Sequence, residues 1–524
     1  MMKKFKFFAF VAILVGLVAC NKDSEATLLN RIPADADVAA VINVKKLVKS
    51  AGGDLSGCNL NLPEYIVKRD SAGCTEFVQK LATSGLDVEN LGVWLKDSEG
   101  YLVVEVKDAD KLSSFLSQEK FHARGNNGGY EFYAFDDADA KPSYCAVGDG
   151  YAYFYDHSGS FDRVSKSLSE AVSKPMGSTA FGRYASEGNA GGVIVDARTF
   201  LNYMGKDVML PIAVQASGRF CVKVDVDSDE ASATSVLLND KGEKVSVESM
   251  GLKFDTSATI SAEALAYLAP SECLVYAFAL KNVDWDSLVD SSTKSMGLNP
   301  MQTMVAGMAK EYLKKIDGTV AIGIGFDGGK SDIEKLNAGS GLNYVPFTIV
   351  VQTAPGKAKG LLGDISALLA TFGMNPSQLP DGFSAHISDD GTMLYGKAEG
   401  NTLVLSSRPI ERYNNNGATA GMTGNIAAFG LWLPADYPLI RDFGVVDNLL
   451  VEGGADMKDS EGELDIKITG ATAGGFVERL IKLATAYQAG FNDIESQMAV
   501  ESNFTPEEPA SDADYFDGFE PTYF

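Results

Sequence analysis

The chain of 524 residues carries 70 acidic and 45 basic side chains, which gives a net charge of −25. This balance excludes a nucleic-acid-binding protein, because such proteins gather lysine and arginine against phosphates. It also argues against a basic patch that binds a membrane surface. A chain of this length exceeds what one compact core organises, so it predicts two or more domains.

The start of the chain has the pattern of a secretion signal. Basic residues precede an apolar run from Phe7 to Val18, which is shorter than the roughly 20 apolar residues of a membrane-spanning helix. The run ends in Leu17-Val18-Ala19-Cys20, which resembles the lipobox of bacterial lipoproteins. We therefore predict a signal peptide over residues 1–19, cleavage between Ala19 and Cys20, and a lipid on Cys20. The alternative is an ordinary signal peptide with a chance cysteine.

Residues 20–27 are expected to form a short tether, and five further cysteines follow it. Three of these cysteines lie in apolar, strand-like runs and are expected to be buried and free: Cys145, Cys221 and Cys273. Cys58 and Cys74 flank a segment that contains Gly, Asn and Pro. In an oxidising envelope these two can form a disulfide, and two free thiols are the alternative.

Weak internal similarity recurs along the chain in one order. Four pairs of segments match, and each combines strand-like runs with polar turns or helical patterns: 32–47 with 269–288, 91–106 with 320–353, 130–137 with 383–390, and 191–201 with 427–439. A repeated order predicts duplication. We expect an α+β fold of two tandem homologous halves, residues 28–258 and 259–500, each a mixed, partly antiparallel sheet with packed helices.

Helical periodicity appears at four places: 63–84, 300–316, 356–372 and 474–499. The second of these helices carries an apolar stripe at helical spacing, made of Met301, Met304, Val305, Met308 and Tyr312. Such a stripe is typical of a face packed in a core, and a metal or haem site is the less favoured alternative. The end of the chain, residues 501–524, is acidic and contains proline, so it is expected to be disordered.

Sequence motifs for catalysis, nucleotide binding or metal binding are incomplete throughout the chain. Gly323, Gly325 and Gly328 fit a dinucleotide fingerprint, but no helical pattern follows them to hold a phosphate. The acidic run at 225–230 lacks the glycine and glutamate of a calcium loop. The three histidines are not spaced for zinc. We therefore predict no catalytic residue, no cofactor, no metal site and a non-enzymatic protein.

Two other functions stay open at this stage. The first is an envelope hydrolase or glycan-processing enzyme whose active site is assembled from scattered residues. The second is a surface carbohydrate-binding protein, which requires exposed tryptophans for stacking on sugars. The chain has Trp94, Trp285 and Trp432, and the first and last of these lie in apolar runs that favour core packing.

The lipobox, the opening "IPADADVAAVINVKKL" and a length of about 500 residues resemble an uncharacterised family of Bacteroidetes lipoproteins, known as a domain of unknown function. The resemblance implies a lipid-anchored outer-membrane protein on the periplasmic face or at the cell surface. "NKDSE" after Cys20 resembles the surface-export signal of that phylum, although Ser24 interrupts its acidic pair. The implied partners are the membrane, reached through the lipid on Cys20, and another envelope protein or a glycan.

The resemblance also suggests sites of modification. Envelope proteins of that phylum are O-glycosylated at Asp-Ser/Thr-apolar triplets, and two such triplets centre on Ser71 and Ser287. A solvated turn at Ser71 and a helix cap at Asp286 or Ser287 are the alternatives to glycosylation.

Overall fold

The computed structural model describes residues 28–56, 59–61, 74–97, 99–135, 143–155, 160–199, 218–245, 255–295, 300–327, 345–387, 392–414, 416–443, 446–456, 461–469 and 475–483. The predicted signal peptide, the lipid site at Cys20, the tether and the acidic tail all lie outside these residues.

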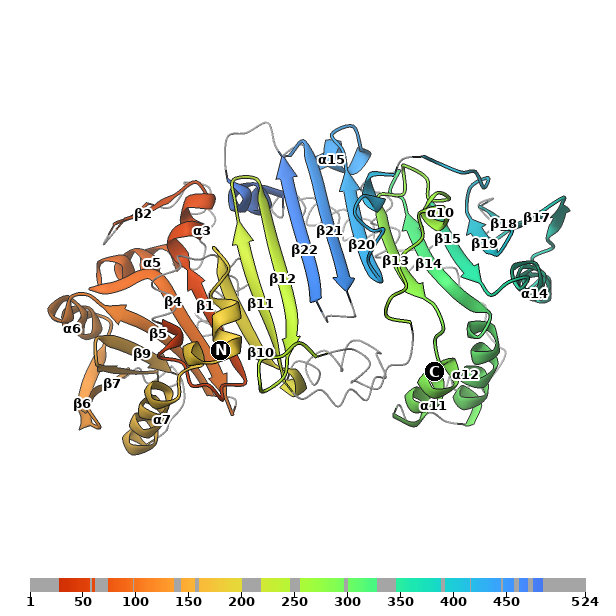
Figure 1. The fold of residues 1–524 in the computed structure, drawn as a ribbon. Helices are drawn as coiled ribbons and strands as arrows, with labels where there is room; N and C mark the ends of the chain where they lie inside the picture. The colour runs from red at the N-terminus through yellow and green to blue at the C-terminus, as the bar shows by residue number, and fades with distance from the viewer. Residues whose placement is uncertain are drawn as a thin grey trace, which may run out of the picture.

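Twenty strands form one antiparallel sheet that runs through the molecule as a broad curved band (Figure 1). A separate two-stranded ribbon is made of β2 (Asp54–Ser56) and β3 (Asn59–Asn61). From one edge, the first ten strands of the sheet are β6 (Phe121–Asn127), β7 (Tyr130–Phe135), β8 (Tyr144–Gly148), β9 (Tyr151–Tyr155), β5 (Glu99–Val106), β4 (Leu86–Lys96), β1 (Val38–Asn43), β10 (Gly191–Asp196), β11 (Arg219–Val226) and β12 (Glu230–Leu238).

The sheet continues from β12 into ten further strands. In order they are β22 (Glu461–Thr469), β21 (Asn448–Asp456), β20 (Ala427–Leu433), β13 (Leu274–Leu280), β14 (Ile316–Ile324), β15 (Phe347–Thr353), β19 (Thr402–Ser406), β18 (Met393–Glu399), β17 (Gly382–His386) and β16 (Ser377–Leu379). The two sets of ten strands are connected in the same order along the chain, when each set is counted from its own edge of the sheet. The two sets meet where β12 pairs with β22.

The predicted fold of two α+β halves, each with its own mixed sheet, is wrong. Strands β12 and β22 pair antiparallel from Glu230 opposite Lys467 to Val236 opposite Glu461, so the strands belong to one sheet. Every other pairing is antiparallel as well. The physical reason is that both strands expose unpaired backbone groups at an edge, and pairing them satisfies those groups.

Side chains alternate between two faces of the sheet. We name each face after a helix that covers it: the α10 face, after α10 (Ala262–Leu265), and the α14 face, after α14 (Ala358–Thr371). In β13, Val275 and Ala277 lie on the α10 face and are buried. Tyr276 and Phe278 alternate with them and therefore lie on the α14 face.

Helices cover the α10 face at the first half of the strand order. The covering helices are α7 (Phe161–Ser173) and α8 (Ala180–Ala185). Their apolar residues pack with the buried ring of Trp94 in one core. Ser160 caps α7 by accepting a hydrogen bond from the backbone N–H of Arg163, as expected of a serine at a helix N-terminus.

The α14 face is covered in three places. Helices α3 (Val44–Ser50), α5 (Cys74–Thr83) and α6 (Ala109–Gln118) contribute apolar residues to the core over the first strands. Helix α15 (Pro438–Phe443) and the helical residues 476–483 join the same core over the middle strands. Helix α14 covers the last strands. Between the middle and the last strands, Tyr276 and Phe278 of β13 are exposed on this face, where the apolar side chains of β14 are half-buried.

Two helices lie beyond the ends of the strands. Helices α11 (Trp285–Ser295) and α12 (Pro300–Leu313) connect β13 to β14 and hang below the lower ends of these strands in Figure 1. Asp284 caps α11 by accepting a hydrogen bond from the backbone N–H of Ser287 at 3.0 Å. The cap is therefore Asp284, whereas the sequence suggested Asp286 or Ser287.

Candidate functional site

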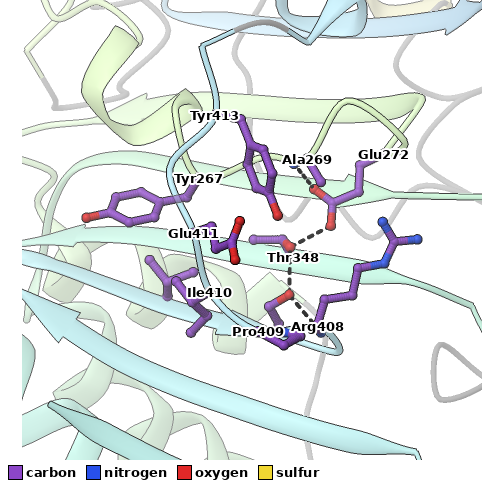
Figure 2. Close-up of a pocket in the computed structure, with 11 residues that line it drawn as sticks. Tyr267, Ala269, Glu272, Thr348, Arg408, Pro409, Ile410, Glu411 and Tyr413 are labelled. Carbon is purple, nitrogen blue, oxygen red and sulfur yellow. Dashed lines mark hydrogen bonds between the residues drawn. The ribbon is translucent and has the colours of Figure 1, made fainter. Parts of the chain in front are cut away.

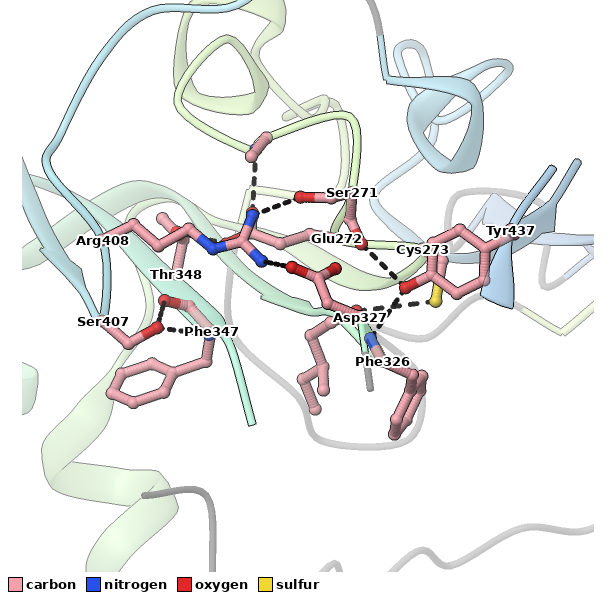
Figure 3. A network of polar contacts seen from close by, with 12 residues as sticks. Ser271, Glu272, Cys273, Phe326, Asp327, Phe347, Thr348, Ser407, Arg408 and Tyr437 are labelled. Carbon is pink, nitrogen blue, oxygen red and sulfur yellow. Dashed lines mark hydrogen bonds and ion pairs between the residues drawn. The ribbon is translucent and has the colours of Figure 1, made fainter. Parts of the chain in front are cut away.

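Arg408 lies at the centre of a polar network just after β19 (Figure 3). Its guanidinium group donates hydrogen bonds to the hydroxyl of Ser271 and to the carboxylate of Asp327. Ser271 precedes β13 and Asp327 follows β14. The network therefore fastens three segments that are far apart in the sequence.

Tyr437 extends this network at the start of α15. Its hydroxyl accepts a hydrogen bond from the backbone N–H of Phe326 at 2.7 Å and donates one to the carbonyl of Ser271 at 3.0 Å. The ring is buried, and burial raises the pKa of the hydroxyl. Burial also raises the pKa of the adjacent Cys273 thiol to about 11, so this cysteine is protonated and unreactive at neutral pH.

Glu272 is fully buried beside the network (Figure 2). Its carboxylate accepts hydrogen bonds from the backbone N–H of Ala269 at 2.9 Å and from the hydroxyl of Thr348 at 2.5 Å. Burial raises the pKa of this carboxyl group, and the hydrogen bonds and the charge of Arg408 oppose the shift. Each oxygen of Glu272 is already engaged by the protein.

A narrow depression lies over Glu272 and is the one candidate for a polar site that we identify in the described residues. Its rim includes Tyr267, Glu411 and Tyr413, whose side chains lie around Thr348 in Figure 2. A carboxyl group beside a tyrosine could transfer protons. However, Glu272 is held by Thr348 and Ala269, so the arrangement fastens the strands and presents no free carboxylate to a substrate.

We predict that Glu272→Gln changes how the stability of the protein depends on pH. A carboxyl group with a raised pKa binds its proton more tightly in the folded chain, so its contribution to stability is lost as pH rises above the ordinary pKa of about 4.3. Glutamine has no such proton to lose, so this loss of stability is absent in the variant. The hydrogen-bonding partners of residue 272 are kept, because the Thr348 hydroxyl can accept a hydrogen bond from the new amide. The Tm of the variant relative to the natural protein should therefore increase between pH 4 and pH 7.

Differential scanning calorimetry measures this difference, with the exposed Glu170→Gln as the control. If the Tm difference for Glu272→Gln stays constant across the pH range, this result would contradict the claim that burial raises the pKa of Glu272.

The residues singled out in the sequence are not brought together. Cys58 and Ser71 lie outside the described residues, and the side chain of Cys74, which begins α5, is not described either. Ser287 is exposed in the first turn of α11, so an enzyme could reach its hydroxyl. The disulfide and the two glycosylation sites stay predictions. Cys145, Cys221 and Cys273 are free and buried, as expected.

None of the three tryptophans is fully exposed, as stacking on a sugar at the surface would require. Trp94 is 1% exposed and stacks on Tyr101 at a centroid distance of 4.6 Å. Trp285 and Trp432 are half-buried. Within the described ranges, no helix is long and apolar enough to cross a membrane, and no three side chains of His, Cys, Asp or Glu are grouped to hold a metal ion.

The second candidate is an apolar surface around α12. In the described part of the chain, ten large apolar side chains are exposed, and eight of them lie between Tyr276 and Leu379. The predicted core face of α12 is among them, since Met304 is 61% and Met308 59% exposed. The prediction of a packed stripe is therefore wrong for these residues. We define the apolar surface as Met304, Met308 and Tyr312 of α12 together with Tyr276 and Phe278 of β13.

The two parts of the apolar surface are connected through β14. Helix α12 ends at Leu313 and β14 begins at Ile316. Val320 of β14 lies opposite Phe278, and Ile322 lies opposite Tyr276. On the other side of β13, the ring of Phe429 stacks on Tyr276 with their centroids 6.2 Å apart. On the sheet, the apolar side chains therefore continue across β14, β13 and β20, and α12 precedes β14 along the chain.

The first strands of the sheet are covered at the corresponding place. Helix α5 directly precedes β4, as α12 directly precedes β14, but α5 folds back onto the strand that follows it. The α14 face of β4, with Leu91 and Val93, packs against residues of α3 in one core. Helix α12 instead packs mainly against α11. Among the described residues, the α14 face is thus covered by α5 on β4, whereas on β14 α12 does not take the corresponding place.

Comparisons with known proteins leave the chain without an assigned family. No family model matches it, and no curated protein matches it. Among solved structures it is similar to crystal form IV of TP0453, with 12% identity and a TM-score of 0.27 over 40% of this chain and 79% of that one. Crystal form I of TP0453 gives 11% identity and a TM-score of 0.25 over 44% and 87% of the two chains.

Proposed function

We propose that this chain is a lipid-anchored protein of the cell envelope, held at the outer membrane through Cys20, that binds another envelope component and does not catalyse a reaction. The observation that carries the proposal is the apolar surface. Exposed apolar patches of this kind, bordered by polar residues, mark sites of interaction. Methionine is well suited to such a site, because its flexible thioether adapts to irregular partners.

Covering the apolar surface contributes favourable free energy to binding. Full burial of a large apolar side chain contributes about 1.5–3 kcal/mol. Met304, Met308 and Phe278 are 61%, 59% and 44% exposed, so covering each recovers on the order of 1 kcal/mol. The five residues together therefore contribute several kcal/mol, and removing one side chain alone has a small effect.

The polar depression supports an enzyme less well than the apolar surface supports binding. An enzyme needs a carboxylate or nucleophile that reaches its substrate, whereas Glu272 is fully buried and hydrogen-bonded at both oxygens. A carbohydrate-binding role would require exposed tryptophans, and Trp94 is buried while the other two are half-buried.

Photo-crosslinking in intact cells tests the proposed function. The photoreactive amino acid benzoylphenylalanine replaces Tyr312 at the edge of the apolar surface, alone or together with Met304→Gln and Met308→Gln. We expect a crosslinked envelope component whose yield falls about tenfold in the double substitution. The matched control is Val172→Gln, an exposed apolar residue on α7. Absence of any crosslinked species from Tyr312 would contradict the proposal.

The lipid anchor makes a separate prediction. Cys20→Ala removes the only sulfur at the expected cleavage site, so it should abolish labelling by a fatty acid and leave the signal peptide uncut. Metabolic labelling followed by intact-mass analysis measures both effects. Cys145→Ala is the control, because this buried thiol should not affect labelling. Fatty-acid label retained on Cys20→Ala would contradict the anchor.

A further inference from the structure

We propose that the pairing of β21 with β22, in the middle of the sheet (Figure 1), is a pH-dependent joint. The pairing is strongest when Glu452 or Asp465 carries a proton, and it loosens when both carboxyl groups are ionised. This proposal concerns the folded sheet alone, so it does not depend on the lipid anchor or on the apolar surface.

The two acids lie side by side on the α10 face. Val275, which lies on this face, is opposite Gly430, and Gly430 is opposite Glu452. Glu452 in turn lies directly opposite Asp465 of β22. Directly opposite side chains in an antiparallel pair have Cβ atoms about 4.5–5.5 Å apart, and like charges at such positions are destabilising. Two ionised carboxylates therefore repel each other across this pairing.

Both carboxyl groups are partly withdrawn from water. Glu452 and Asp465 are half-buried, and the Oε1 atom of Glu452 is buried without a hydrogen-bond partner among the described residues. The turn at Gly421 lies over this oxygen, since a Cβ atom there would lie 3.6 Å from it. Burying a charged oxygen without a partner is unfavourable, so a proton on the pair stabilises the folded joint.

The other charged groups on this face do not neutralise the pair. On β12, β21 and β22, they are Glu230, Asp456, Glu461, Glu463 and Lys467. Lys467 forms an ion pair with Glu230 at 3.6 Å, and Lys244 forms one with Glu461 at 2.7 Å. Neither β20 nor the turn over Glu452, residues 417–424, contains a charged residue. The surroundings of the two acids are therefore mainly acidic.

These surroundings favour the protonated form. Burial raises the pKa of Glu452, and the charge of Asp465 raises it further. Burial also raises the pKa of Asp465, and the charges of Glu230 and Glu463 add to this shift. Tyr184 of α8 also reaches this face, where its hydroxyl contacts the carbonyl of Thr234. Burial raises the pKa of Tyr184 to about 12, so this residue stays uncharged.

The sign of the effect follows from the direction of these shifts. A carboxyl group with a raised pKa contributes stability that is fully present below its ordinary pKa, about 3.9 for Asp and 4.3 for Glu. This contribution is lost as the pH rises through the raised pKa. The joint is therefore strongest in mild acid and weakens toward neutral pH.

The opposite face of the same strands keeps them together at neutral pH. Val451 lies opposite Ile466, and both side chains pack in the core of the α14 face. These apolar contacts do not titrate. Ionisation of the acids therefore loosens the pairing without unfolding the sheet.

Hydrogen exchange of the full purified protein, measured by mass spectrometry, tests the joint. Protection factors correct for the intrinsic effect of pH on exchange and report how often each backbone N–H group opens. We expect the protection of β21 and β22 to fall at least about tenfold between pH 4 and pH 7, because one unit of pKa corresponds to a factor of ten. In Glu452→Gln/Asp465→Asn the change should be less than about twofold. The control is the exposed Glu170→Gln, which should behave as the natural protein.

The single variants show whether the two acids act as a pair. Each substitution removes the same repulsion, so the two single effects on the logarithm of the protection at pH 7 should sum to more than the effect of the double variant. Each single variant should also reduce the pH dependence, so the test does not depend on the folding of the double variant.

Three outcomes would overturn the proposal. Protection that falls equally in the natural protein and in the variants would show that other groups set the pH dependence. An equal fall in β4, Leu86–Lys96, would show that the whole sheet responds and not the joint. Strictly additive single effects would show that Glu452 and Asp465 do not interact.

Discussion

Gly430→Ala should prevent the chain from folding stably. A Cβ atom at Gly430 would lie 1.9 Å from the carbonyl oxygen of Ala418 and 2.9 Å from its carbonyl carbon. Both atoms belong to the backbone, so no side-chain rotation relieves the contact. Strand β20 lies between β13 and β21, and a shift of β20 disturbs two pairings. We expect a loss of more than about 4 kcal/mol in the free energy of unfolding.

The control is the same substitution at Gly360 in α14, where a Cβ meets no atom within 4 Å. Alanine is favoured over glycine in a helix by about 0.5–1 kcal/mol, so Gly360→Ala should be neutral or stabilising. Soluble yield and thermal unfolding followed by circular dichroism compare the two. A Gly430→Ala protein with the yield and Tm of the natural chain would contradict the close packing of Ala418 on β20.

Trp94→Ala should destabilise the first part of the sheet by about 3–5 kcal/mol. Trp94 stacks on Tyr101 and meets the edge of Tyr153 with centroids 6.1 Å apart. It lies on β4, which joins β1 to β5. Removing the indole leaves a large cavity in this core, because the surrounding rings are held by neighbouring strands and relax only partly.

Leu95→Ala is the matched control for Trp94→Ala. Leu95 is the next residue of β4, faces the opposite side of the sheet and is 38% exposed, so its loss should cost about 1 kcal/mol or less. Urea unfolding followed by circular dichroism gives both values. Similar losses from the two substitutions would show that the core around Trp94 is not packed as described.

Helices could be predicted from the sequence where apolar residues recur at helical spacing over a long segment. The pattern over 356–372 predicts a helix, and α14 spans Ala358–Thr371. The pattern over 300–316 likewise corresponds to α12, Pro300–Leu313. Periodicity reports which residues share a face of an element, and this information is local. It is sufficient to place a helix within a few residues.

The pairing of distant strands could not be predicted in the same way. Strand β12 is largely a run of small and polar residues, "EASATSVLL", and nothing in it selects β22 as its partner. Backbone hydrogen bonds make the pairing, and backbone groups are the same in every strand. From the sequence alone we therefore expected two sheets, whereas the structure has one.

The candidate sites show the same limit. An apolar stripe predicts an apolar face, but not whether another element covers it, and α12 and α5 have opposite outcomes. Glu272 was missed, although an acidic residue directly before a strand-like run was visible in "SECLVYAF". Its burial depends on Thr348, which is 76 residues away along the chain. Contacts over such separations carry no local signal.

Oxidation of individual methionines tests most directly whether the apolar surface is occupied in the envelope. Dilute hydrogen peroxide oxidises accessible methionine to the sulfoxide, and the yield at each position is read by mass spectrometry. The internal controls are Met176 and Met422, which are 0% and 2% exposed. We predict that Met304 and Met308 oxidise rapidly in purified, delipidated protein and at least about fivefold more slowly in isolated membranes. Equal rates in the two preparations would mean that nothing covers the surface in the envelope and would contradict the binding function.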